Sequence, residues 1–211
     1  MQSFSFANIR SNSVIMIYGN IREGITCMIR DILTAKHASH YHIIDPDIEK
    51  HQDIYWDAQL AHSHYDNMFI NAAIRDAKKK LQNGDIKGLW MVMDNPGDAI
   101  NYDFQGGTPL TPFSGLRQLF MNGRCLRINT LIGLDRVVEM RDTFTFNVDY
   151  VILVVNYTKD FDIKAIYDMY IRNMMEYDAF TSAICDDGIY VIECLNAKTG
   201  KTTLYKLDFS M

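Results

Sequence analysis

The sequence predicts an α/β fold, with a mainly parallel central sheet flanked by helices and a β-hairpin near its C-terminal end. Three observations predict this fold. Apolar runs of strand length alternate with segments of helical periodicity along the chain. The composition, 48% hydrophobic and 22% charged, is ordinary for a globular protein. Residues 1–211 show no repeat, low-complexity tract or linker, and this length fits one domain.

The first half of the chain supplies two strand–helix units. Residues 13–18 (SVIMIY) predict a buried strand that ends at a glycine. From Ile25 onward, apolar residues recur at i, i+3, i+4, i+7 and i+8, which predicts an amphipathic helix. Residues 41–45 predict a second strand, and the same periodicity from Tyr65 to Ala73 predicts a helix of about 16 residues.

The middle of the chain continues the alternation. Residues 88–93 (GLWMVM) form a continuous apolar run typical of a central strand, and Asp94 follows it. The segment 96–112 is rich in Pro, Gly, Asp and Asn, which predicts a loop. A short helix is expected over 113–120, and 127–134 (RINTLIGL) predicts another strand.

The last third predicts one more strand–helix unit and the hairpin. Residues 149–155 (DYVILVV) predict a strand, and apolar positions over 163–174 lie on one face of a helix. Two strand-like runs, 188–195 and 202–208, are joined by the polar segment 196–201, as expected for a β-hairpin.

Charge and cysteine usage narrow the function. The formal net charge of -5 disfavours a surface that binds nucleic acid broadly. The run Lys78 to Lys80 is a local basic rim or, more simply, a solvated helix end stopped by Asn83-Gly84.

No apolar run reaches the roughly 18 residues of a spanning helix, and no secretory signal precedes residue 13, so we expect a cytosolic protein without a membrane partner. The cysteines favour buried free thiols over a disulfide framework: Cys27, Cys125, Cys185 and Cys194.

The turn after the first strand has part of a Walker A pattern. That pattern, G-x-x-x-x-G-K-[ST], is matched at Gly19, Gly24 and Thr26, but Ile25 stands at the lysine position. A strand before it and a helix after it provide the required context. A βα turn with glycines present for purely steric reasons is the simpler interpretation of this motif alone.

The chemistry of this turn opposes tight triphosphate binding. In Walker A loops, backbone N–H groups and the lysine ammonium converge on the β- and γ-phosphates. Ile25 offers only hydrocarbon, and Glu23 adds negative charge. Each charge-assisted hydrogen bond that is lost is worth about 1.5–3 kcal/mol. Arg22 could substitute for the lysine, and this alternative stays open.

The order of motifs after the turn carries a family resemblance. The strand LWMVMDN (89–95) ends in an acid, GRCLRINTLI (123–132) leads into another strand, and a segment over 140–147 precedes DYVIL (149–153). This order resembles the genome-packaging ATPases of nucleocytoplasmic large DNA viruses, a branch of the FtsK–HerA superfamily. The resemblance spans roughly 13–208 and implies a RecA-like P-loop NTPase fold, with 1–211 forming a single degenerate P-loop ATPase-like domain.

Some of the family's functional positions are retained. Thr26 falls where the family has its Mg²⁺-binding hydroxyl, and Asp94 falls at the first Walker B acid. Gly19, Gly24 and Thr26 would be a vestigial nucleotide-binding loop, and Thr26 with Asp94 a vestigial magnesium site. No cofactor is expected in the first instance, and ATP with Mg²⁺ is expected if nucleotide binding survives.

Four catalytic positions of the family are replaced. Ile25 replaces the lysine, Asn95 replaces the second Walker B acid, Asp135 replaces the sensor glutamine and Thr145 replaces the arginine. An arginine finger alone contributes about 10³–10⁵ in rate, and one preorganised donor about 10²–10³. We therefore expect no intact catalytic residue.

The resemblance implies a catalytically inactive homologue of a viral DNA-packaging ATPase, acting as a structural or regulatory subunit in virion assembly. The alternatives are an active ATP-hydrolysing DNA-packaging motor with a non-standard P-loop and an unrelated α/β binding module. The implied partners are viral assembly proteins, an active packaging-ATPase paralogue or further copies of this chain, in the host cytoplasm (viral factory) or the virion. Arg124 and Arg127 are candidates for an interface, and DNA contact stays open.

Two pairs of histidines have the spacing of possible metal ligands. His40-x-His42 and His62-x-His64 could each place two imidazoles on one side of a strand, as in some zinc sites. No cysteine lies nearby and no E-x-x-H partner completes a set, so no metal site is predicted.

Overall fold

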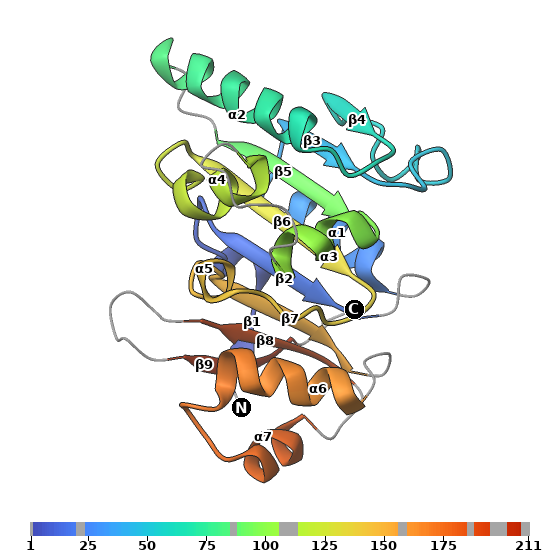
Figure 1. The fold of residues 1–211 in the computed structure, drawn as a ribbon. Helices are drawn as coiled ribbons and strands as arrows, with labels where there is room; N and C mark the ends of the chain where they lie inside the picture. The colour runs from blue at the N-terminus through green and yellow to red at the C-terminus, as the bar shows by residue number, and fades with distance from the viewer. Residues whose placement is uncertain are drawn as a thin grey trace.

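The computed structural model describes residues 2–19, 24–84, 88–105, 114–155, 160–184, 188–194 and 202–207. Within these residues the strands form one nine-stranded sheet in the order β1-β9-β8-β7-β2-β6-β5-β3-β4 (Figure 1). Strand β8 runs antiparallel to both of its neighbours, β7 and β9, and the other neighbouring strands are parallel. This arrangement confirms the predicted α/β fold with a mainly parallel sheet and a C-terminal hairpin.

The elements follow one another along the chain as strands and helices. The strands are β1 (Gln2–Phe4), β2 (Val14–Tyr18), β3 (Tyr41–Ile44), β4 (Leu60–His62), β5 (Leu89–Asp94), β6 (Ile128–Leu134), β7 (Tyr150–Val154), β8 (Ile189–Glu193) and β9 (Thr203–Leu207). The helices are α1 (Thr26–Ala35), α2 (Asn67–Gln82), α3 (Asp98–Gln105), α4 (Gly115–Asn122), α5 (Asp142–Thr145), α6 (Asp160–Ile166) and α7 (Tyr177–Ala183).

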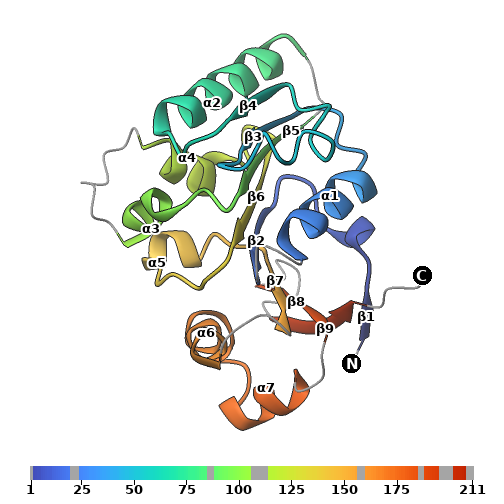
Figure 2. The same cartoon turned by 90° about the vertical axis from the view of Figure 1, so that its right-hand side faces the viewer.

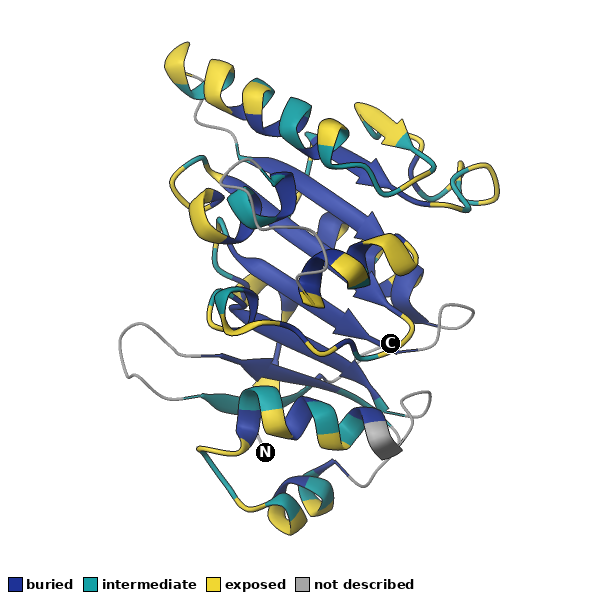
Figure 3. Cartoon of the chain, viewed as in Figure 1, coloured by how far each residue is buried: buried dark blue, intermediate teal, exposed yellow. Residues whose placement is uncertain are grey.

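The sheet separates two hydrophobic cores. Alternate residues of a strand point to opposite faces. In β2, Ile15 and Ile17 therefore pack on the side of α1, whereas Val14, Met16 and Tyr18 pack on the side of α2 to α7. Figure 2 shows α1 on one side of the sheet and α3, α4 and α5 on the other. The central strands are buried on both faces, while the outer sides of the helices are exposed (Figure 3).

Helix α2 shows how local sequence sets the element boundaries. Asp66 caps its start, accepting a 2.7 Å hydrogen bond from the backbone N–H of Met68. Its end follows the prediction, with Asn83 at the cap and Gly84 at a φ of 80° in the left-handed region. The helix is 16 residues long, as the periodicity predicts, and the lysine run lies in its last turns.

Several elements differ from the sequence predictions. The predicted loop 96–112 contains α3, because Ile100 and Phe104, one helical turn apart, are both fully buried in the core. The short elements β1, β4, α5 and α7 were not predicted, since three to seven residues show too little periodicity. The helix predicted over 163–174 is α6, followed by a π turn at Tyr167–Ile171.

Some predictions concern residues outside the described ranges, and the prediction that the cysteines are buried is wrong in part. The whole hairpin linker 196–201 and Cys185 lie outside the described residues. Cys194 is a buried free thiol as expected, but Cys27 and Cys125 are exposed, so the expectation of buried thiols is wrong for these two. No helix among the described residues combines the length and apolar character needed to cross a lipid bilayer.

Candidate functional site

The degenerate Walker A turn lies at the carboxyl end of β2. A Cβ on Gly19 would come within 2.9 Å of Cβ of Val154, and one on Gly24 within 3.4 Å of the same side chain. Gly19 thus lets the end of β2 approach the end of β7 closely, whereas 3.4 Å at Gly24 is an ordinary van der Waals contact. Arg22 and Glu23 lie outside the described residues, so the proposed substitution of the lysine by Arg22 remains a hypothesis.

Ile25, at the lysine position, is a core residue. It is fully buried and directly precedes α1. A Cβ on Gly133 of β6 would come within 2.2 Å of Ile25 Cγ2, so the isoleucine occupies the space that this glycine leaves open. The side chain at the lysine position therefore packs on the sheet and supplies no positive charge for a phosphate.

Thr26 and Asp94, the retained pair, are in direct contact. Thr26 Oγ1 donates a 2.7 Å hydrogen bond to Oδ2 of Asp94, the last residue of β5. Tyr55 donates a second, at 2.8 Å, to the same oxygen. Burial raises the pKa of Asp94, the charge of Asp45 raises it further, and the two hydroxyl donors act in the opposite direction. Burial, together with the charge of Asp94, also raises the pKa of Tyr55.

Asp45 and His51 complete the surroundings of Asp94. Asp45 follows β3 directly, and its Oδ2 lies 2.7 Å from Nδ1 of His51. The ligand atoms that Asp45, His51 and Asp94 could offer lie within 4.8 Å of one another. Sequence reasoning missed Asp45, His51 and Tyr55. The signal for Asp45 was available, because it ends a predicted strand as Asp94 does.

Asn95 and Asp135, two of the replaced positions, come together. They follow the paired strands β5 and β6 and line one pocket of about 300 Å³. Asn95 adopts a φ of 44°, and its backbone N–H donates to the carbonyl of Gly133 at 3.0 Å. An amide at position 95 cannot take a proton from water as a carboxylate does.

Thr145 does not join this group. It ends α5, and its Oγ1 lies 3.4 Å from the carbonyls of Met140 and Arg141. The backbone of Asp149, just before β7, pairs with Val14 at the beginning of β2. Thr145 therefore lies by the amino ends of the parallel strands, at the opposite edge of the sheet from the turn.

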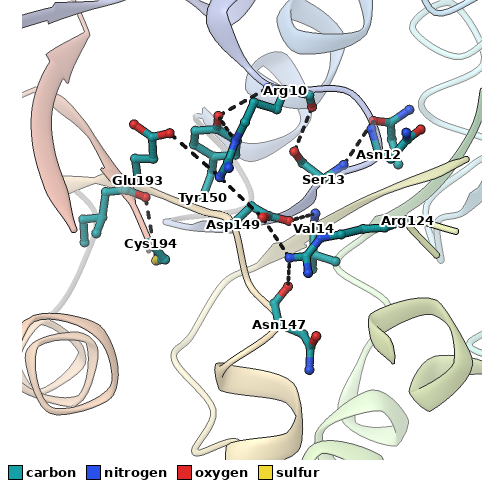
Figure 4. Close-up of polar contacts among 12 residues, drawn as sticks. Arg10, Asn12, Ser13, Val14, Arg124, Asn147, Asp149, Tyr150, Glu193 and Cys194 are labelled. Atoms are coloured by element: carbon teal, nitrogen blue, oxygen red, sulfur yellow. Dashed lines mark hydrogen bonds and ion pairs between the residues drawn. The ribbon is translucent and has the colours of Figure 1, made fainter. Parts of the chain in front are cut away.

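Arg124, a predicted interface residue, takes part in a polar network at that amino edge (Figure 4). Its Nη2 donates to Asp149 Oδ1 at 2.8 Å and to the carbonyl of Asn147 at 3.2 Å. Asp149 Oδ2 accepts from the backbone N–H of Val14 at 2.8 Å. Nη2 of Arg10 lies 3.5 Å from Oδ1 of Asp149 and 3.8 Å from Oε1 of Glu193. The network supports a structural role for Arg124, joining the segments before β2 and β7.

Arg127, the other predicted interface residue, is exposed. It adopts a φ of 56° just before β6 and lines a pocket of about 650 Å³ with Lys36 and His37. This pocket also lies at the amino edge of the strands. The structure therefore places both arginines away from the turn.

The histidine pairs do not assemble metal ligands among the described residues. His42 is buried, and its Nε2 lies 3.9 Å from Asp76. Burial lowers the pKa of His42 in spite of this carboxylate. His62 stacks on Phe69 at 5.1 Å between ring centres, and the ring centre of His64 lies 5.8 Å from that of His62.

An ATP with Mg²⁺, as the resemblance implies, fits these residues only in part. The Thr26–Asp94 pair fits the metal ion, since a hydroxyl and a carboxylate are the oxygen ligands that Mg²⁺ takes in P-loop sites. The buried side chain of Ile25 does not fit the phosphates.

Comparisons with known proteins are informative on structure. No protein-family model matches the sequence, and no curated protein matches it either. The DNA-packaging ATPase B204 of Sulfolobus turreted icosahedral virus is similar in structure, with a TM-score of 0.63 and 15% identity over 95% of this chain and 100% of that one.

Two further structures agree. The genome-packaging NTPase B204 of Sulfolobus turreted icosahedral virus 2, in complex with AMP, gives a TM-score of 0.67 at 12% identity over 95% of this chain and all of that one. The pCW3 conjugation coupling protein TcpA, with ATPγS, gives 0.60 at 15% identity over 95% of this chain and 61% of that one. At these identities the likeness establishes the fold, and this chain has the fold of the P-loop ATPases.

Proposed function

We propose that this chain is a catalytically inactive relative of a viral DNA-packaging ATPase and acts as a structural or regulatory subunit in virion assembly. The observation that carries the proposal is the burial of Ile25 against Gly133, where a nucleotide-binding loop needs a cation. The amide of Asn95 at the position of the second acid supports it. The structural likeness to B204 over its whole length supports a packaging-related origin.

The proposed partners are those that a subunit in virion assembly would have. We therefore propose binding to an active packaging ATPase, to another assembly protein or to further copies of this chain, in the infected cell or the virion.

An active motor is the second candidate, and one observation favours it. The hydrogen bond between Thr26 and Asp94 is intact, as a magnesium site requires. ATP hydrolysis by the purified protein, abolished in Asp94→Ala, would establish this candidate and overturn our proposal.

The deciding experiment measures ATP binding by calorimetry with Mg²⁺, and turnover in parallel, for the wild type and Ile25→Lys. We expect no turnover in either. We expect the lysine to raise ATP affinity by roughly 10- to 100-fold, the effect of one charge-assisted contact. Ile25→Met is the matched control, because it fills similar volume without charge and should bind ATP as weakly as the wild type. Tight ATP binding by the wild type would contradict the role given to Ile25.

A further inference from the structure

Asp45 and Asp94 lie side by side at the carboxyl ends of neighbouring parallel strands. The pairing of β3 with β5 matches Ile44 with Met93, so the next residues on the two strands are these two acids. Ile43 and Val92, two residues earlier on each strand, pack on the α1 side, so alternation directs both carboxylates to that face. Both aspartates are only 2% exposed.

Neither carboxylate has a permanent cation beside it in the described part of the chain. The ion-pair partner of Asp45 is His51, and the donors to Asp94 are two hydroxyl groups. Oδ1 of Asp94 is buried without a hydrogen-bond partner among the described residues. Two adjacent buried carboxylates repel each other, and an unsatisfied buried acceptor is costly, so the arrangement favours a bound cation.

His51 adds a nitrogen ligand to these oxygens. Its Nδ1 lies 2.7 Å from Oδ2 of Asp45, so a metal ion can replace the proton shared by these two atoms and bind both of them. The ligand atoms of the three residues lie within 4.8 Å of one another. Around an ion with bonds of about 2.1 Å, ligand atoms are separated by at most about 4.2 Å, so shifts below about 1 Å would close the site. The His51 side chain is 21% exposed, which gives an ion access.

We propose that Asp45, His51 and Asp94 bind a divalent transition-metal ion, of which Mn²⁺ and Zn²⁺ are the suitable probes. An imidazole together with carboxylates suits these ions, whereas Mg²⁺ is bound through oxygen ligands alone. The hydroxyl groups of Thr26 and Tyr55 hold the carboxylate of Asp94 in place. The site goes beyond the proposed function, because it requires neither nucleotide nor hydrolysis.

The test is metal binding by the full chain in the absence of nucleotide. After treatment with a chelator, calorimetric titrations with MnCl₂, ZnCl₂ and MgCl₂ should show one Mn²⁺ or Zn²⁺ bound per chain, and Mg²⁺ binding at least tenfold weaker. Asp45→Asn and His51→Gln should each lower the Mn²⁺ affinity at least tenfold, since even loss of an outer-shell partner costs about 10- to 100-fold. His64→Gln, an exposed histidine outside the cluster, is the matched control and should bind as the wild type does.

A second measurement uses the wild type and does not depend on how the variants fold. Substoichiometric Mn²⁺ should broaden the NMR signals of the His51 ring before those of the other histidines. The proposal is overturned if the wild type binds neither Mn²⁺ nor Zn²⁺, if Mg²⁺ binds as tightly as they do, or if another histidine broadens first. Since no nucleotide is present, these outcomes are independent of the ATP experiment.

Discussion

The buried carboxylate at the amino ends of the strands and those at the carboxyl ends have different surroundings. At the amino ends, Asp149 accepts from the backbone of Val14 and lies beside the guanidinium groups of Arg10 and Arg124. At the carboxyl ends, Asp45 and Asp94 lie together with one histidine and two hydroxyl groups. The first arrangement is complete within the chain, as expected of a structural element. The second leaves negative charge for a ligand to neutralise, as expected of a binding site.

The largest expected effect on the free energy of unfolding comes from removing the carboxylate charge at the amino ends of the strands, compared with removing one at the carboxyl ends. Asp149→Asn should lower the free energy of unfolding by about 2–3 kcal/mol, a value reduced because the two arginine side chains are partly exposed. Asp94→Asn in metal-free buffer should change it by less than about 1 kcal/mol, since a neutral amide relieves the repulsion from Asp45. Urea unfolding measures both.

Equal destabilisation by the two substitutions would remove the distinction between the two ends. Arg124→Ala serves as a control for the first end. It removes one of the two cations near Asp149, so it should cost less than Asp149→Asn does.

The second prediction concerns Ile25 as a packed side chain. In Gly133→Ala, the new methyl group would overlap Cγ2 of Ile25, and overpacking of this kind costs about 1–3 kcal/mol. In an Ile25→Ala background the overlap is absent, so Gly133→Ala should cost much less there. A double-mutant cycle of unfolding free energies measures this difference, and additive effects would show that Ile25 does not occupy the space above Gly133.

The smallest expected effect is a pH dependence at His42, on the strand that leads to Asp45. Burial lowers the pKa of His42, the charge of Asp76 opposes this, and Lys80 adds to it. The unfolded chain therefore binds a proton at His42 more readily than the folded chain does. The contribution of neutral His42 to the free energy of unfolding is complete above its ordinary pKa of 6.5 and decreases as the pH falls below that value. Between about pH 7 and pH 5, His42→Leu should lose less stability than the wild type, by up to about 1 kcal/mol.

Thermal unfolding across this pH range measures the contribution of His42. His64→Gln, which alters an exposed histidine, should keep the wild-type slope. A steeper slope in His42→Leu than in the wild type would mean that the charged imidazole stabilises the fold.

The sequence predicted the elements that strong local patterns specify. The apolar runs located the main strands of the sheet, and the helical periodicity located α1 and α2. The cluster around Asp94 was harder to predict, because His51 and Tyr55 come from a stretch of turns with no periodicity. Asp45 and Asp94 become neighbours only through the strand order, which one sequence does not specify. The role of Arg124 depends on Asp149, which is 25 residues away in the chain.

The parallel pairing of β1 with β9 has a consequence for how the molecule is assembled. Gln2 is matched with Tyr205, so this edge of the sheet joins segments separated by almost the whole chain. Closing so long a loop is entropically costly and slow, so β1 should dock after the interior strands have formed. During synthesis β1 can pair with β9 only after β9 has left the ribosome, and until then its backbone groups are open to other chains.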